Sequence, residues 1–185
     1  MTSTPLSICV YCGSRPGRDE AYMTAARTFG EAIATHRWRL VYGAGDVGMM
    51  GEVATAARES RAGMLGVIPV HLLNREAPQG RFSERVITET MHERKKVMLM
   101  NADAIVMLPG GAGSLDEFFE ALTWRQLGLH DKPIYLLNIN DFWETLQALM
   151  KHVVEQGFAE NDILQTVKSV DSVDALVLEL SAIQS

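Results

Sequence analysis

The feature that most constrains the fold is a regular alternation of short apolar runs with amphipathic helical patterns along the whole chain. Five runs have the length of β-strands and are bounded by glycine, proline or polar residues: Ser7–Tyr11, Arg39–Tyr42, Met64–Ile68, Ala104–Leu108 and Ile134–Leu137. Their hydrophobicity is nearly continuous, which is typical of strands that are covered on both faces. The alternation therefore predicts an α/β fold of the doubly wound, Rossmann-like type, with a mostly parallel sheet and helices on both faces.

Helical periodicity fills the spaces between these runs. Apolar residues recur with helical spacing in three sets, which we interpret as core: Tyr22, Ala25, Ala26 and Phe29; Phe142, Leu146, Leu149, Met150 and Val153; Val173, Leu176, Val177 and Leu180. The chain of 185 residues contains no linker or repeat, so we expect a single domain over residues 1–185. One connection, roughly Pro69–Thr90, is long enough to predict a functional loop.

Charge and composition exclude several classes of protein. With 17 basic and 23 acidic residues the net charge is −6, which argues against nucleic acid as a partner. No apolar run approaches a membrane span, and the N-terminus lacks the basic segment of a secretory signal, so we expect a cytoplasmic protein. Cys9 and Cys12 lie in one apolar run and supply only half a zinc site, so we interpret them as strand packing.

Three of the predicted strands run directly into glycine-rich turns, which span Cys12–Gly17, Gly43–Gly51 and Pro109–Ser114. In a parallel sheet such turns follow the carboxyl ends of the strands, where ligands bind. Glycine lets backbone amides approach a ligand, and a helix that opens behind the turn adds unpaired amides, so the pattern predicts a phosphate site. If the strand order is 3-2-1-4-5, the binding crevice opens between the first and fourth strands, beside Gly13, Ser14 and the third turn.

The middle turn also matches G-x-G-x-x-G at Gly43, Gly45 and Gly48. A dinucleotide fingerprint needs an acidic residue at the end of the next strand, and here that strand ends in Pro69 and Val70 instead. The match is therefore weak support for a dinucleotide cofactor.

Two charged segments flank the fourth strand. Ser114 and Glu117 have the spacing of a helix capping box, and Glu117 would also lie within reach of a sugar attached to a phosphate in the third turn. Met91–Lys96 opens the preceding helix and has the composition of a solvated helix face. Arg94 in this segment leads into the strand whose exit is the third turn, and a guanidinium binds phosphate or carboxylate oxygens in pairs.

The run Pro109–Glu117 resembles the P-G-G-x-G-T-x-x-E signature of the Lonely Guy family of cytokinin-activating nucleoside 5′-monophosphate phosphoribohydrolases, often mislabelled as lysine decarboxylases. Further blocks resemble the family in the same order: Tyr11–Ser14, Tyr42–Gly51, Met91–Lys95 and Thr123–Pro133. The chain departs from the family at Ser114, where threonine is usual, at Ala44, where glycine is usual, and at Asp46, where a small polar residue is common.

The resemblance implies hydrolysis of the N-glycosidic bond of a nucleoside 5′-monophosphate to free base and ribose 5-phosphate, with no cofactor and no metal. It implies Arg94 and Glu117 as the catalytic residues. Substrate binding is implied at Glu76, Arg94, Lys95, Gly111, Ala112, Gly113, Ser114, Leu115, Asp116, Glu117 and Thr123, and the first turn adds Gly13 and Ser14. The resemblance also implies a homodimer with sites near the interface.

Three other functions stay open at this point. A non-catalytic nucleotide or cofactor carrier would need the glycine turns but no carboxylate at the sugar. A dinucleotide-dependent oxidoreductase would use the turn Gly43–Gly48, and a decarboxylase would need pyridoxal phosphate on Lys95 or Lys96. The sequence does not identify the base; Met91, Met98 and the pair Met49 and Met50 are candidates for an apolar pocket that would accept a prenyl group.

Overall fold

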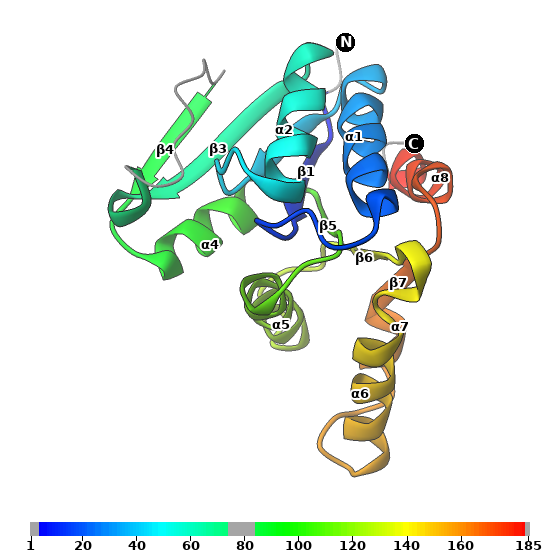
Figure 1. Ribbon diagram of the computed structural model, residues 1–185. Coiled ribbons are helices and arrows are strands. Elements are labelled where there is room, and N and C mark those ends of the chain that lie inside the picture. The colour runs from blue at the N-terminus through cyan, green and yellow to red at the C-terminus, as the bar shows by residue number, and fades with distance from the viewer. Residues whose placement is uncertain (1–3, 74–83, 184–185) are drawn as a thin grey trace.

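The computed structural model describes residues 4–73 and 84–183, and its strands form one sheet in which all six pairings are parallel (Figure 1). The strands are β1 (Ser7–Tyr11), β2 (Arg39–Tyr42), β3 (Gly63–Pro69), β4 (Glu84–Thr88), β5 (Ala104–Met107), β6 (Ile134–Leu137) and β7 (Val167–Val170), in the order β4-β3-β2-β1-β5-β6-β7. The helices are α1 (Glu20–Thr35), α2 (Gly48–Glu59), α4 (Met91–Met100), α5 (Ala112–Gln126), α6 (Glu144–Glu155), α7 (Ile163–Thr166) and α8 (Val173–Ile183), with short 3-10 helices η1 (Val70–Leu72) and η2 (Ile139–Asp141).

The five predicted strands are confirmed as β1, β2, β3, β5 and β6, and the predicted order is confirmed among them. In register, Cys9 of β1 lies opposite Val41 of β2 and Ile105 of β5. The α/β, Rossmann-like class is confirmed as well. The first and fourth predicted strands, β1 and β5, are adjacent at the centre of the sheet, as the doubly wound topology requires.

The sheet also has two edge strands that the sequence does not reveal. β4 lies inside the connection Pro69–Thr90, and of its residues only Thr88 is buried. β7 is equally polar, with Lys168 and Ser169 exposed. Charged and polar residues are common on edge strands because they discourage pairing with another chain, and here they hide the apolar signature of a strand.

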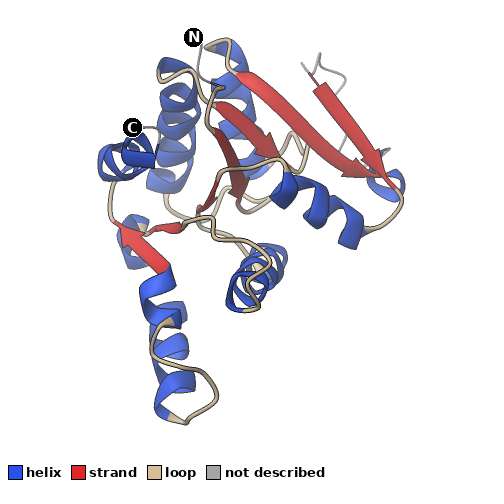
Figure 2. Cartoon of the chain, turned by 180° about the vertical axis from the view of Figure 1, so that it is seen from behind, coloured by secondary structure: helices blue, strands red, loops and turns tan. Residues whose placement is uncertain are grey.

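Helices cover both faces of the sheet (Figures 1 and 2). Side chains such as Ile8 and Val10 of β1 pack against α1, α2 and α8, whereas Cys9 and Tyr11, which point to the opposite face, pack against α4, α5 and α6. Cys9 and Cys12 are buried free thiols, so their interpretation as packing residues is confirmed. Burial raises the pKa of both thiols, which keeps them protonated.

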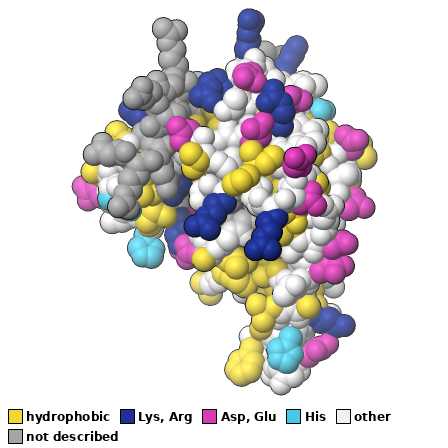
Figure 3. Space-filling model, in the orientation of Figure 1, with side chains coloured by type: hydrophobic (Ala, Val, Ile, Leu, Met, Phe, Trp, Pro, Cys, Tyr) yellow, Lys and Arg dark blue, Asp and Glu magenta, His cyan; other side chains and the backbone are white. Residues whose placement is uncertain are grey.

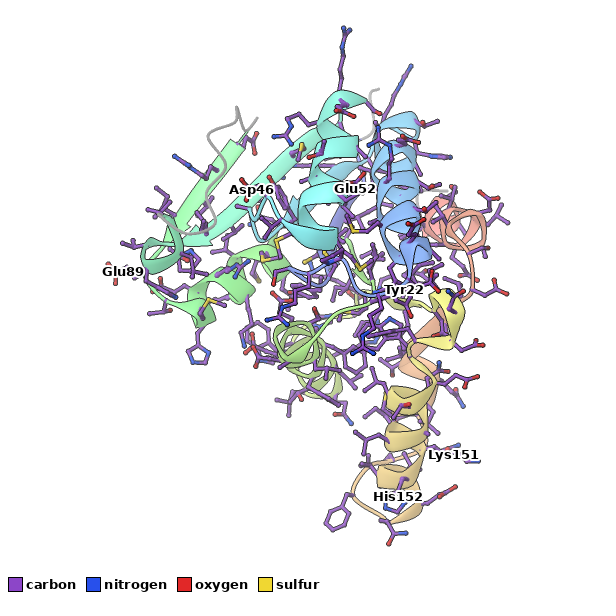
Figure 4. The ribbon with its side chains drawn as sticks, viewed as in Figure 1. Tyr22, Asp46, Glu52, Glu89, Lys151 and His152 are labelled. Atoms are coloured by element: carbon purple, nitrogen blue, oxygen red, sulfur yellow. The ribbon has the colours of Figure 1, made fainter. Side chains whose placement is uncertain are left out.

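One part of the molecule projects from this body: α6 and the loop after it, with Lys151 and His152 near the free end of the helix (Figure 4). The predicted core stripe of this segment is wrong in part. Leu146 and Met150 are buried, but Leu149 of α6 and Phe142, which precedes the helix, are exposed. Across the described ranges, no helix has the length and apolar character that crossing a membrane requires.

Candidate active site

The three glycine-rich turns meet at one edge of the sheet, as predicted. The turn after β1 lies between the other two because β1 lies between β2 and β5. Gly13 donates its backbone N–H to the carbonyl of Pro109 at 3.0 Å and accepts a hydrogen bond from the backbone N–H of Met50 at 3.2 Å. These two bonds join all three turns around Gly13.

Glycine at position 43 makes room for an arginine. A Cβ on Gly43 would lie 1.8 Å from Nη2 of Arg94, which donates a hydrogen bond to the Gly43 carbonyl at 2.8 Å. Gly48 has φ +61, and a Cβ there would lie 2.3 Å from the carbonyl carbon of Ser14. Two glycines of the G-x-G-x-x-G match are thus required by close packing around Arg94 and the first turn.

The departures from the family pattern in the middle turn have different consequences. Ala44 is fully buried and adopts φ 59, a left-handed conformation that destabilises a non-glycine residue by about 1 kcal/mol. Asp46 lies at the exposed side of the turn (Figure 4), and its carbonyl oxygen would lie 2.2 Å from a Cβ on Gly51. The aspartate side chain therefore faces solvent while its backbone packs against α2.

Below these turns lies a cavity of about 500 Å³ between α4, α5 and the start of α2. It is lined by Cys12, Gly13, Ser14, Arg15, Met50, Leu72, Met91, Arg94, Gly111, Ala112, Gly113, Ser114, Asp116 and Glu117. Its volume is in the range of sites that hold a small ligand. The cavity thus collects groups from all of these segments at the crevice that the strand order predicts.

The first turn of α5 supplies the cavity with backbone amides. The predicted capping box at Ser114 and Glu117 is wrong: the helix begins at Ala112 behind Gly111, whose lack of a side chain leaves the end uncapped. The physical reason is that Gly111 and Gly113 leave the turn open, so the chain becomes helical two residues before Ser114. The leading amides of an α-helix have no acceptor within the helix, and their dipoles favour an anion.

A capping box does occur in this region, but on α4. Glu93 donates its N–H to Oγ1 of Thr90 at 3.1 Å, and the Glu93 carboxylate accepts from the N–H of Thr90 at 3.4 Å. This box fixes where α4 begins, and Arg94 follows in its first turn. The segment Met91–Lys96 is therefore only partly a solvated face, because Arg94 and Lys95 are buried.

Arg94 is a buried cation with unused donors. Only 4% of the residue is exposed, one arm of the guanidinium donates to the Gly43 carbonyl, and Nη1 lies 3.8 Å from Sδ of Met91. The Nε–H has no hydrogen-bond partner among the described residues. A buried donor without a partner is unfavourable, so the free side of the guanidinium is suited to bind an anionic or hydroxyl group in the cavity.

Glu117 shares the cavity with Arg94. It is 8% exposed, and burial raises the pKa of its carboxyl from 4.5 to about 7. Arg94 lowers this pKa, Asp116 raises it, Lys95 lowers it, and Glu120 raises it. A carboxyl with a pKa near neutrality can accept and release a proton in the same turnover, which is the property of a catalytic acid or base.

The structure brings together most of the site residues that the sequence predicts, but not all. Gly13, Ser14, Arg94 and the residues of 111–117 except Leu115 line the cavity. Leu115 is half-buried against the core, and Thr123 is exposed two helical turns beyond Glu117. Lys95 is buried beside the cavity and pairs with Asp116 and Glu120. Glu76 lies outside the described residues.

Three cavity residues were not assigned to the site from the sequence: Cys12, Arg15 and Leu72. Position could have indicated two of them, since Cys12 and Arg15 flank the predicted Gly13 and Ser14. Of the methionines predicted for an apolar pocket, Met50 and Met91 line the cavity, whereas Met49 and Met98 are buried in the core.

Comparisons with known proteins show which family the chain resembles. A family model described as "possible lysine decarboxylase" matches residues 50–180. The cytokinin riboside 5′-monophosphate phosphoribohydrolase of Rhodococcoides fascians is 44% identical over 84% of this chain and 79% of its own length. The enzyme of the same name from Oryza sativa subsp. japonica, LOG, is 40% identical over 94% of this chain and 72% of its own.

Among solved structures, the molybdenum cofactor binding protein of Rippkaea orientalis superposes with a TM-score of 0.75 at 19% identity and full coverage of both chains, which is a likeness of fold. The family model and the curated relatives match most of the chain, including the run Pro109–Glu117 that frames the cavity. The chain therefore belongs to the Lonely Guy (LOG) family of cytokinin riboside 5′-monophosphate phosphoribohydrolases, the family whose model is described as possible lysine decarboxylase.

Proposed function

We propose that this protein is a cytoplasmic enzyme whose residues 1–185 form one hydrolase domain, and that it cleaves the N-glycosidic bond of a nucleoside 5′-monophosphate to free base and ribose 5-phosphate. The observation that carries the proposal is Glu117: a buried carboxyl with a pKa of about 7 in the same cavity as the open end of α5 and Arg94. A cavity that only held a nucleotide would not need this carboxyl, because a buried carboxylate is costly without a function.

The 5′-phosphate binds at the start of α5 in this proposal. The amides of Ala112, Gly113 and Ser114 supply donors and the positive end of the helix dipole, and Ser114 supplies its hydroxyl. Glu117 lies one helical turn further along α5, so it faces the ribose when the phosphate is held at residues 112–114. The base then extends toward Met50, Leu72 and Met91, the apolar part of the cavity.

The chemistry uses both charged residues. Cleavage of a ribosyl–base bond passes through an oxocarbenium-like state in which positive charge grows on the sugar. The Glu117 carboxylate stabilises this charge and takes a proton from the water that attacks the anomeric carbon. The base leaves with the electron pair of the broken bond and gains a proton from solvent, and Glu117 returns its own proton to solvent after the step. Arg94, held by the Gly43 carbonyl, orients Glu117 and the ribose or its phosphate.

The test is a product assay without added metal. Incubation with AMP, GMP, CMP and a prenylated AMP is expected to release free base and ribose 5-phosphate from at least one of these nucleotides, and the preferred nucleotide identifies the base. Recovery of every nucleotide intact after long incubation at high protein concentration would instead support a carrier that binds nucleotides without cleaving them.

Arg15 is expected to strengthen phosphate binding. It lines the cavity opposite α5, and basic side chains stand on this face beside the start of that helix (Figure 3). Arg15→Ala should raise KM for the nucleotide about tenfold, the effect of one charge-assisted hydrogen bond, and leave kcat nearly unchanged. Arg18→Ala, which removes an exposed arginine outside the cavity, is the matched control. Equal KM values for the two variants would contradict this role.

We also propose that the enzyme is a homodimer that associates through the outer face of α5 and the loop that follows it. Phe119, Leu127 and Leu129 are 40%, 68% and 65% exposed there, and hydrophobic side chains gather over α5 and the base of α6 (Figure 3). Thr123 lies on this face, turned away from Glu117, so its implied contact with substrate would be made in the cavity of the second subunit.

Leu127→Asp is expected to convert the dimer to monomers, because a charge buried in an interface is strongly unfavourable. The measurement is the molar mass by light scattering at micromolar concentration. Leu178→Asp, which changes an equally exposed leucine on α8 at the opposite face of the sheet, should leave the dimer intact. Monomeric wild-type protein, or dissociation by Leu178→Asp alone, would contradict the proposed interface.

A further inference from the structure

A second charged cluster, formed by Lys95, Asp116 and Glu120, lies beside the cavity, and of the three only Asp116 lines it. Nζ of Lys95 lies 2.9 Å from Oδ2 of Asp116 and 2.9 Å from Oε2 of Glu120, and the Lys95 side chain is 5% exposed. Burial lowers the pKa of Lys95, but the hydrogen bonds to Glu120 and Asp116 outweigh burial and raise it above its ordinary value. The lysine is therefore a fixed cation shared by two carboxylates of α5.

The placement of this cluster relative to the proposed catalytic residues is specific. Arg94 and Lys95 are successive residues of α4, while Asp116 and Glu120 flank Glu117 on α5. Arg94 and Glu117 line the cavity, and Lys95 does not. The ion pair between Lys95 and Asp116 thus joins α4 to α5 at the residues next to Arg94 and Glu117.

The sheet alone does not set the distance between these helices. α4 packs mainly on β3 and β4, whereas α5 packs on β1, and β2 separates these supports. A change of about 1 Å in the placement of a catalytic group lowers rates strongly. A direct link between α4 and α5 helps to keep Arg94 and Glu117 at a constant separation, and the ion pairs of Lys95 supply one in addition to the apolar cluster that both helices share.

We propose that Lys95 and Glu120 are positioning residues, which hold α4 against α5 so that Arg94 and Glu117 face each other across the nucleotide. This inference rests on the proposed function and departs from the role implied by the family resemblance, in which Lys95 binds substrate. With both of its carboxylate partners on α5 and no surface in the cavity, Lys95 acts through Asp116 and Glu120 instead.

The cluster also acts on the charge of Glu117, which gives the test a specific readout. The groups facing this carboxyl are Arg94 and Lys95 from α4, Asp116 and Glu120 from α5, and the buried Tyr11 and thiols of β1 and its turn. Lys95 lowers the pKa of Glu117, and Glu120 raises it. Removing the lysine should therefore move the acid limb of the pH–kcat profile to higher pH, and removing the charge of Glu120 should move it to lower pH.

The experiment compares the full-length variants Lys95→Met, Lys95→Arg and Glu120→Gln with Lys96→Met, an exposed neighbour on α4, as control. The substrate is the nucleotide that the wild-type protein cleaves fastest, and kcat and KM are measured from pH 5 to 9, with thermal melting to check the fold. Lys95→Met should lower kcat by about tenfold to a hundredfold with little change in KM. Lys95→Arg should keep most of the wild-type kcat. Glu120→Gln should lower kcat less than Lys95→Met does, and should move the acid limb of the pH–kcat profile to lower pH.

Each outcome is informative. A Lys95→Met variant with wild-type kcat at every pH, or with a raised KM and unchanged kcat, overturns the positioning role, and the second result would return Lys95 to direct substrate binding. If Lys95→Met does not fold, Glu120→Gln decides alone, since this replacement keeps size and removes one charge: an unchanged kcat at the optimum pH overturns the positioning role, and a lowered kcat at an unchanged KM supports it. A wild-type protein that cleaves no nucleotide overturns the proposed function itself, whatever the variants do.

Discussion

Glu117→Gln is expected to lower kcat by about a thousandfold or more while the nucleotide still binds, because the amide keeps the shape of the side chain but can neither carry negative charge nor take a proton from water. The α5 amides and Arg94 that would hold the phosphate and ribose are unchanged in this variant. Release of ribose 5-phosphate measures turnover, and calorimetric titration with AMP measures binding. Glu160→Gln, an exposed residue of the projecting segment, makes the same chemical change as a control.

The same variant should also reveal the burial of Glu117 through stability. The folded protein raises the pKa of this carboxyl from 4.5 to about 7, so the contribution of the carboxyl to stability is full below pH 4.5 and is lost as the pH rises through 7. Compared with wild type, Glu117→Gln should therefore gain free energy of unfolding across this window, by on the order of 3 kcal/mol. A difference that does not change with pH, or turnover within a few-fold of wild type, would show that Glu117 is not the buried catalytic carboxyl.

Arg94→Ala is expected to lower kcat/KM on the order of a hundredfold or more, the usual effect of losing a preorganised charged group. Arg94 lowers the pKa of Glu117, so its loss should also move the acid limb of the pH–rate profile upward, and part of the lost activity should return at alkaline pH. Steady-state kinetics between pH 6 and 9 measures both effects.

The variant Arg94→Lys separates the contribution of the positive charge at position 94 from that of the planar guanidinium. A lysine keeps the positive charge but lacks the planar fork that reaches the Gly43 carbonyl and leaves further donors toward the cavity. It should keep the pH profile near that of wild type and remain slow. An Arg94→Ala variant that loses activity only in proportion to its loss of folded protein would assign Arg94 a structural role.

The central strands of the sheet can be predicted from the sequence because their burial requires apolar residues. Strands β1, β2, β3, β5 and β6 are buried on both faces, so nearly every residue in them is apolar and their runs are visible in the sequence. β4 and β7 have one unpaired edge and exposed polar side chains, so neither shows the continuous apolar run that marks the other strands, although Val86, Ile87 and Thr88 of β4 are β-branched. The edges of the sheet are therefore less visible in the sequence than its centre.

Some residues of the candidate site are likewise predictable from the sequence, and others are not. The glycine turns, Arg94 and Glu117 are predicted because each requires a particular residue type after a strand or at the opening of a helix. The capping box at Ser114 is a wrong prediction, since the spacing of serine and glutamate is equally satisfied inside a helix that starts earlier. The separation of Lys95 from the cavity depends on how α4 is rotated about its axis, and two adjacent basic residues give no signal of which one faces inward.

The hydrogen bond between Arg94 and Gly43 has a consequence for how this enzyme can diverge. Its acceptor is a main-chain oxygen supplied by a residue 51 positions away, so no exchange of side chains among the neighbours can delete it. A new Cβ at position 43 would displace the guanidinium, since it would lie 1.8 Å from Nη2 of Arg94. Variation in the base-facing methionines and leucine can therefore retune which nucleotide is accepted while the arginine stays anchored, and libraries aimed at new substrates should leave this glycine untouched.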